Sequence, residues 1–285
     1  MVSVRQVRSR QINEHDIDGV IDLLTLGFRV RGRDYWRHAL AKLRSHPTPA
    51  GLPKYGYLLE SDGVPVGVIL LIFSAVPSRD AVTTRCNVSS WYVETEFRSH
   101  APLLISQAIK HKNVTYVNIS PAMHTWPIVE AQGFARYSDG QFVAVPALSR
   151  SDGKVIGIGT TPDAHFEPSE LDLLSIHEDY GCRGLWCVTS DRAHPFVFMP
   201  RLVKGVVPCA QLIYCRDIQD FVRCAGPIGR YLALRGRPFV IVDSNGPIPG
   251  LVGTYFDGKS PKYFKGPQRP SFGDLAYTEA VMFGL

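Results

Sequence analysis

Hydrophobic residues divide the first 148 residues into alternating strands and helices. Apolar side chains at helical spacing follow Asn13, and an N-cap residue with Asp16 three positions later is typical of a helix start. Asp62-Gly63 separates two apolar runs, which predicts a tight hairpin turn. The pattern predicts strands over 2–12, 54–60, 64–76, 86–94, 114–120 and 141–147, and helices after Asn13 and over 34–43, 101–111 and 124–132.

The second half of the chain follows a shortened version of the same order. The polar stretch SRSDGK at 149–154 marks a domain boundary, so we expect one domain over 1–148 and another over 155–285. Strand, helix and strand are expected in turn over 207–215, 218–234 and 238–243, with a final strand over 277–285. Because no residue-level repeat accompanies this order, only the order of elements is repeated.

Composition describes an ordinary globular chain. Hydrophobic residues make up 45% and charged residues 20%, and the net charge is +5. Lysine and arginine are scattered rather than gathered in a stripe, which argues against nucleic acid as a partner. The longest apolar run, 64–76, is too short to span a membrane. The basic amino terminus has no apolar core of a secretory signal, so we expect a cytoplasmic protein.

Cysteine spacing and motif searches exclude several chemistries. The six cysteines form no Cys-x-x-Cys pair and no zinc pattern, so we expect buried thiols and no metal site. The chain contains no Walker loop, no Gly-x-Gly-x-x-Gly, no Gly-x-Ser-x-Gly and no His-Glu-x-x-His. These absences weaken nucleotide-dependent, serine-hydrolase and zinc-protease functions.

Two stretches carry a resemblance to a known family. They are WYVETEFRSHAPLLISQAIK at 91–110 and VTYVNISPAMHTWPIVEAQGF at 114–134. In order of elements and position they resemble motifs A and B of the GNAT superfamily of acyl-CoA N-acyltransferases. The resemblance implies an α/β fold with a mixed, mostly antiparallel central sheet flanked by helices. It covers residues 5–148, and the second half would be a degenerate copy, giving two tandem halves.

The resemblance also implies a carrier site. The central strand would leave backbone groups free for the pantetheine arm, and a loop at the next helix start would hold the pyrophosphate. Arg98 keeps the first position of the family's loop, but Ala101 and Leu103 replace its two glycines. The altered loop either holds an unusual donor or has lost the carrier. The implied carrier-binding residues are Tyr92, Val93, Arg98, Ser99, His100, Ala101 and Leu103.

Acyl transfer to an amine needs a base, and commonly an acid for the leaving thiolate. Glu94, at the end of the central strand, is the first choice of base, although a solvated strand end is the alternative interpretation. The family's usual acidic tyrosine falls on Val129, and Ser120 and His124 are the nearby substitutes. We therefore expect transfer from acyl-CoA, or an acyl carrier protein, to a small-molecule amine between the halves. A non-catalytic binding module is the rival hypothesis.

The second half lacks a comparable carrier loop. Asp217 is expected as an N-cap after the strand over 207–215, and carboxylates at that helix start would repel phosphate. KSPKYFKGPQRP at 259–270 is expected to be a solvated loop, or a lid for an anionic substrate.

Overall fold

The computed structural model describes residues 6–77 and 82–284. The chain divides into two compact units that interleave along the sequence. Unit 1 comprises Met1–Ile119, Phe264–Arg269 and Tyr277–Leu285, and unit 2 comprises Ser120–Tyr263 and Pro270–Ala276. The division of the chain into tandem domains at 149–154 stays a prediction.

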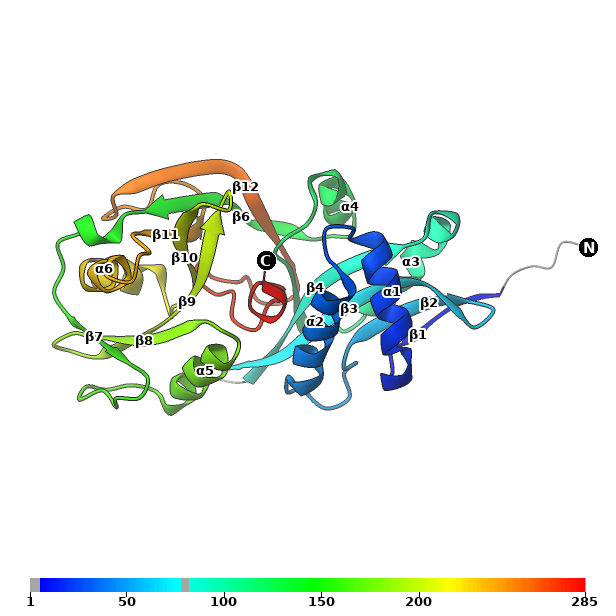
Figure 1. Ribbon diagram of the computed structural model, residues 1–285, viewed down its shortest axis with the longest axis horizontal. Helices are drawn as coiled ribbons and strands as arrows, with labels where there is room; N and C mark the ends of the chain where they lie inside the picture. The colour runs from blue at the N-terminus through cyan, green and yellow to red at the C-terminus, as the bar shows by residue number, and fades with distance from the viewer. Residues whose placement is uncertain (1–5, 78–81, 285) are drawn as a thin grey trace, which may run out of the picture. The chain divides into compact units, whose positions relative to one another are not determined.

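Unit 1 is built on a mixed sheet (Figure 1). Its strands are β1 (Val7–Gln11), β2 (Gly56–Ser61), β3 (Val64–Pro77), β4 (Val82–Val93) and β5 (Val114–Asn118), followed by the end of β12 (Gly253–Lys265). Neighbouring strands from β1 to β4 are antiparallel, whereas β4 and β5 are parallel. The β2–β3 turn lies at Asp62 and Gly63, both with positive φ, as the hairpin prediction requires.

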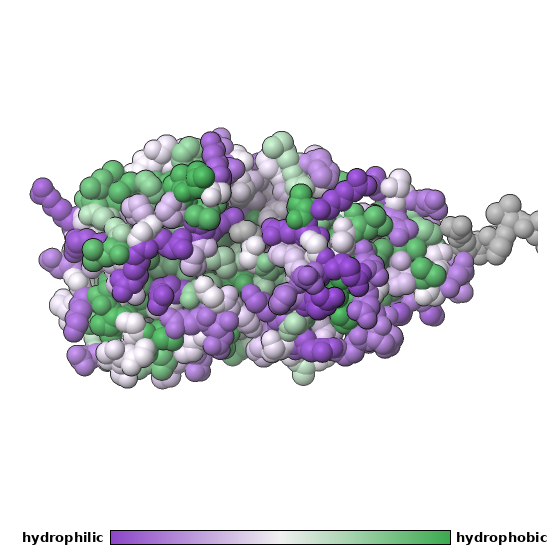
Figure 2. Space-filling model, viewed as in Figure 1, coloured by the Kyte–Doolittle hydropathy of each residue, from purple (hydrophilic) through white to green (hydrophobic). Residues whose placement is uncertain are grey.

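The α-helices of unit 1 lie close to their predicted positions, at α1 (Ile17–Gly27), α2 (Arg33–Ser45) and α3 (Ala101–Ala108). The unit also contains the 3-10 turns η1 (Glu14–Asp16) and η2 (Thr95–His100) and the π-helical turn η5 (Ala280–Gly284), of which η5 replaces a predicted strand. The Asp16 carboxylate accepts a 2.8 Å hydrogen bond from the Asn13 backbone N–H, which begins the first helix as expected. Helix α2 buries Trp36 and Leu40, and polar side chains gather over its outer face (Figure 2).

Unit 2 is also built on a mixed sheet. Its strands are β6 (Ala135–Ala144), β7 (Lys154–Gly157), β8 (Arg183–Val188), β9 (Ala193–Val203), β10 (Val207–Tyr214) and β11 (Phe239–Ser244), in the order β6-β11-β10-β9-β8-β7, with the first part of β12 beside β6. Its helices are η3 (Met123–Thr125), α4 (Trp126–Ala131), η4 (Pro146–Leu148), α5 (Pro168–Asp179) and α6 (Ile218–Ala233). Phe221, Cys224 and Ile228 of α6 bury one helix face in the core of this unit.

The two units share one pattern of strand connections. In unit 1, three antiparallel strands, β2 to β4, lead through α3 to β5, which lies parallel to β4. In unit 2, β8 to β10 lead through α6 to β11, which lies parallel to β10. The prediction of a mixed, mostly antiparallel sheet flanked by helices is confirmed.

Three expectations about the second half were wrong or incomplete. The residues over 277–285 form no strand among those described, but a turn and η5. The last strand is instead β12, which includes the first part of the expected loop over 259–270. Within it Lys262 is buried and its Nζ donates to Asp243 Oδ1 at 2.6 Å, so this lysine is a core ion pair and not part of a solvated lid.

The six cysteines are all buried and free, as expected from their apolar neighbours. Burial raises the pKa of the Cys86 thiol on β4 and of the Cys215 thiol after β10. Both thiols are therefore poor nucleophiles at neutral pH.

Candidate functional site

The central feature of unit 1 is an opening between two parallel strands. Strand β5 pairs with β4 only from Thr84 to Asn87, whose partners are Val114 to Val117. Beyond Asn87, β4 continues to Val93 with β3 as its paired neighbour. Among the described residues, the last part of β4 therefore has no β5 partner on one edge. An extended ligand can use such an edge for backbone hydrogen bonds.

A β-bulge lies at the beginning of this free edge. Ser89 is opposite Leu70 and Tyr92 is opposite Val68, so Ser90 and Trp91 together face one residue of β3. Ser90 adopts a positive φ of 47°, which is uncommon for a residue with a side chain. Bulges of this kind redirect side chains and end strand pairing. Among the described residues, the buried indole N–H of Trp91 has no hydrogen-bond partner.

The end of β4 holds the residues predicted to contact pantetheine. The Tyr92 ring packs so closely on α1 that a Cβ at Gly27 would lie 2.4 Å from it. Val93 is buried, and the backbone N–H of Glu94 donates to Val66 O at 2.9 Å. Tyr92 and Val93 thus lie on the free edge, whereas Glu94 begins the following turn.

The loop predicted to hold the pyrophosphate is a 3-10 turn that leads directly into α3. Within it the Phe97 N–H donates to Glu94 O at 2.9 Å, and the Ala101 N–H donates to Arg98 O. Pro102, in the first turn of α3, has no N–H. Several donors that a glycine loop would offer to phosphate are thus used within the turn or missing.

Side chains at the same turn can replace some of these backbone N–H donors. Arg98 and Ser99 are exposed and His100 is half-buried, and Ser99 Oγ lies 3.2 Å from His100 Nδ1. An arginine can bind phosphate oxygens through two N–H groups. Leu103 is 43% exposed and Ala101 is half-buried, so neither is needed to fill the core. A phosphate group at this turn would therefore be held mainly by side chains.

The two predicted substitutes for the missing acid belong to unit 2. Ser120 is exposed and begins this unit, and His124 is exposed on η3. Val129, at the family's tyrosine position, is buried in α4 and contributes only packing. The residues predicted to bind the carrier, from Tyr92 to Leu103, all belong to unit 1. The structure therefore gathers the predicted site residues into two groups, one in each unit.

Unit 2 contains the counterpart of the β4–β5 opening, and it is filled. Strand β10 has an irregularity at Ile213, and β11 pairs with β10 only as far as Gln211. The Leu275 N–H donates to Ile213 O at 2.7 Å, and the Cys215 N–H donates to Gly273 O at 2.9 Å. The chain itself thus makes the backbone contacts that a ligand would otherwise make.

Sequence reasoning missed a polar cluster at the bulge of β4. Glu279 is only 4% exposed, and its carboxylate accepts a short hydrogen bond from Ser89 Oγ. Its backbone N–H donates to Asn87 Oδ1 at 2.6 Å, so both ends of the residue are attached to β4. Because 190 positions separate Glu279 from Ser89, no local sequence signal could indicate this contact.

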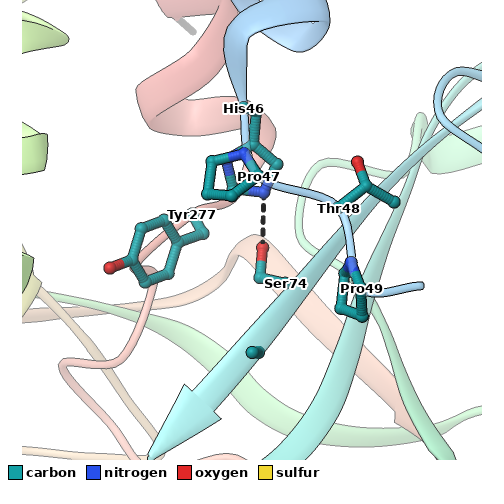
Figure 3. Close-up of a pocket in the computed structure, with 7 residues that line it drawn as sticks. His46, Pro47, Thr48, Pro49, Ser74 and Tyr277 are labelled. Atoms are coloured by element: carbon teal, nitrogen blue, oxygen red, sulfur yellow. Dashed lines mark hydrogen bonds between the residues drawn. The ribbon is translucent and has the colours of Figure 1, made fainter.

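A small pocket lies elsewhere in unit 1, at the end of α2 (Figure 3). Its volume is about 190 Å³, and His46, Thr48, Ser74 and Tyr277 contribute polar side chains to its lining. His46 Nε2 lies 3.0 Å from Ser74 Oγ, and burial lowers the pKa of this histidine. On β4, the partner of Ser74 is Arg85, five positions before Ser90, whereas Tyr277 is two residues before Glu279.

No protein-family model matches the sequence, and no curated protein matches it either. Solved structures do match. A candidate acetyltransferase from Pyrococcus horikoshii is 12% identical, with a TM-score of 0.57 over 95% of this chain and 93% of its own. A GCN5-related N-acetyltransferase from Kribbella flavida is 13% identical, with a TM-score of 0.55 over 93% of this chain and 72% of its own. Another from Anabaena variabilis ATCC 29413 is 10% identical, with a TM-score of 0.56 over 91% and 72%.

These similarities establish the fold and confirm the resemblance inferred from the two motifs. The chain has the fold of the GCN5-related N-acetyltransferase superfamily, GNAT. At this level of identity the chemistry has to be argued from the site. In the part of the chain that the structure describes, no helix is long and apolar enough to cross a membrane.

Proposed function

We propose that the chain is an acyltransferase that binds acyl-CoA along the free edge of β4. The observation that carries this proposal is the contrast between two equivalent openings. Among the described residues, β5 does not pair with β4 beside Tyr92 and Val93, whereas the backbone of residues 273–275 pairs with β10 beside Ile213. This difference between the two openings supports ligand binding at the β4 edge and not at the β10 edge.

The carrier would lie with its pantetheine arm on the edge and its phosphates at the following turn. Backbone groups of Tyr92 and Val93 would pair with the pantetheine amides. Arg98, with Ser99 and His100, would hold the phosphate oxygens through side chains. A phosphopantetheine arm on a carrier protein would use the same edge, so the donor class includes acyl carrier protein.

The reaction would be direct transfer to an amine. The amine nitrogen attacks the thioester carbonyl carbon, the C–S bond breaks, and the proton lost by nitrogen ends on the thiolate. The products are an amide and free coenzyme A. Glu94 stays the base that the resemblance implies, with Ser120 and His124 as acid candidates. A small-molecule amine is the proposed acceptor and the cytoplasm the proposed location.

A non-catalytic binding module is a second candidate. The observation that favours it is the 3-10 turn, because the N–H groups of Phe97 and Ala101 are bonded within it. Without those donors the carrier could bind too weakly for turnover. The two candidates differ in whether a bound acyl-CoA is consumed when an amine is added.

Thermal unfolding with acetyl-CoA and with longer acyl-CoAs tests the proposal. A ligand at a hundred times its dissociation constant stabilises the native state by about 2.7 kcal/mol. Arg98→Ala is expected to weaken that binding, whereas Asp217→Ala, at the start of α6 in unit 2, is the matched control and should bind normally. The absence of any shift in the parent protein would refute coenzyme A as the donor, and unchanged affinity in Arg98→Ala would refute the phosphate position.

A further inference from the structure

The bulge of β4 places two consecutive serine hydroxyls within hydrogen-bond distance of each other. In a regular strand the side chains of Ser89 and Ser90 would point to opposite faces of the sheet. The positive φ of Ser90 breaks that alternation, and the two Oγ atoms lie 3.0 Å apart. A left-handed residue costs about 1–2 kcal/mol. Strained residues of this kind cluster at functional sites.

One hydroxyl of the pair is also hydrogen-bonded to a carboxylate. Ser89 is 4% exposed and donates its hydroxyl to Glu279 Oε2. Ser90 is half-buried, so its hydroxyl is the more accessible end of the chain of hydrogen bonds. The hydrogen bonds therefore run from the more exposed Ser90 through Ser89 to the buried Glu279.

Glu279 is held in this position independently of its side chain. Its N–H donates to Asn87 Oδ1, and the Asn87 amide group donates to Val117 O at 3.2 Å, across the start of the opening. The carboxylate thus lies where β4 and β5 begin to separate. That is also where the free edge begins, so the reacting end of a thioester bound along it would lie near the bulge.

We propose that Ser90, Ser89 and Glu279 form a proton relay that accepts the proton of the attacking amine. This inference rests on the proposed acyltransferase function. The amine N–H bond breaks as the Ser90 oxygen takes the proton. Ser90 passes its own proton to Ser89, and Ser89 passes its proton to the Glu279 carboxylate, which becomes a neutral acid. The relay resets when the proton returns by the same path to the coenzyme A thiolate.

The relay takes the place of Glu94 as the base, and the two candidates differ in position. Glu94 lies four residues beyond Ser90, after the strand has ended, and its backbone begins η2. Glu279 is attached to the bulge itself. In the relay Ser90 is the group that touches substrate, and Glu279 acts through the two hydroxyls.

The test measures release of the coenzyme A thiol from acetyl-CoA with two probe amines, ethylamine and methoxyamine. Ethylamine is largely protonated at neutral pH, whereas methoxyamine is largely neutral and depends less on a base. Glu279→Gln and Ser90→Gly are each expected to lower the rate with ethylamine by about 10²–10⁴-fold, the usual worth of general base catalysis. The loss with methoxyamine should be at least tenfold smaller, and Glu279→Asp should restore part of the rate.

Further measurements separate chemistry from folding and from carrier binding. The double variant Ser90→Gly with Glu279→Gln should react no more slowly than either single variant, because each substitution alone already interrupts the relay. Glu60→Gln, which alters a buried glutamate on β2 that pairs with Arg8 and Arg10, is the structural control. Equal losses with both amines, or an equal loss in Glu60→Gln, would overturn the relay.

Binding of acetyl-CoA by the same proteins distinguishes the two proposals. If the parent protein does not bind it, the proposed coenzyme A function is refuted and the relay falls with it. If the parent binds it but releases no thiol with either amine, the relay is overturned while carrier binding stands.

Discussion

Replacing Gly273 with alanine should destabilise unit 2, because this glycine lets the chain fill the opening beside β10. Gly273 has a φ of +77°, and a Cβ there would lie 2.5 Å from the buried sulfur of Cys215. The left-handed conformation costs alanine about 1–2 kcal/mol. Overpacking against a buried neighbour adds about 1–3 kcal/mol. The free energy of unfolding is therefore expected to fall by about 2–5 kcal/mol.

Two further variants separate these terms in urea unfolding followed by circular dichroism. Gly258→Ala has a similar φ of +65° and no atom within 4 Å of its Cβ, so it should lose only the conformational term. In the Cys215→Ala background, Gly273→Ala should cost less by the overpacking term, because the sulfur is gone. A loss in Gly273→Ala no larger than in Gly258→Ala would refute the close packing inferred at the filled opening.

Two other predictions concern buried charged residues. Lys262→Ala should lower the free energy of unfolding by about 3–5 kcal/mol, because the buried Asp243 carboxylate loses its lysine partner and keeps the 3.4 Å hydrogen bond from Gln141 Nε2. The double variant Lys262→Met with Asp243→Leu should recover most of this loss. Urea unfolding measures both variants, and an unchanged stability in Lys262→Ala would contradict the ion pair. The hydrogen bond from Arg10 lowers the pKa of Asp16 below 3.8, so this carboxylate stabilises the protein above that pH and loses its contribution as pH falls through the folded-state pKa. Asp16→Asn should remove that part of the acid dependence of unfolding as the pH falls below about 5, and an unchanged profile would disprove it.

The first half of the fold was predictable because its signals are local. Asp62-Gly63 specifies a turn in which both residues take positive φ, and Asn13 with Asp16 specifies a helix start. The second half was harder. Strand β9 contains Pro195 and Pro200, which argue against a strand in a sheet interior, and β12 contains glycine, aspartate and proline.

The last segment and the polar cluster depend on distant contacts. The apolar residues of 277–285 fit a strand by composition, but the packing of Phe283 against Trp36 belongs to a buried turn. The carrier loop was placed by its order in the chain, and its 3-10 conformation was not visible in the residue types. The bulge at Ser90 and its contact with Glu279 depend on pairing between segments far apart in sequence.

Amide hydrogen exchange with and without saturating coenzyme A reports on each strand edge separately. If the carrier binds along β4, exchange should slow in the segment 88–93, whose edge beyond Asn87 is free of β5. Exchange should not change in the β10 segment 209–215, whose edge is already paired with residues 273–275. Unchanged exchange in the β4 segment at saturation, or protection in the β10 segment instead, would contradict binding of the carrier along β4.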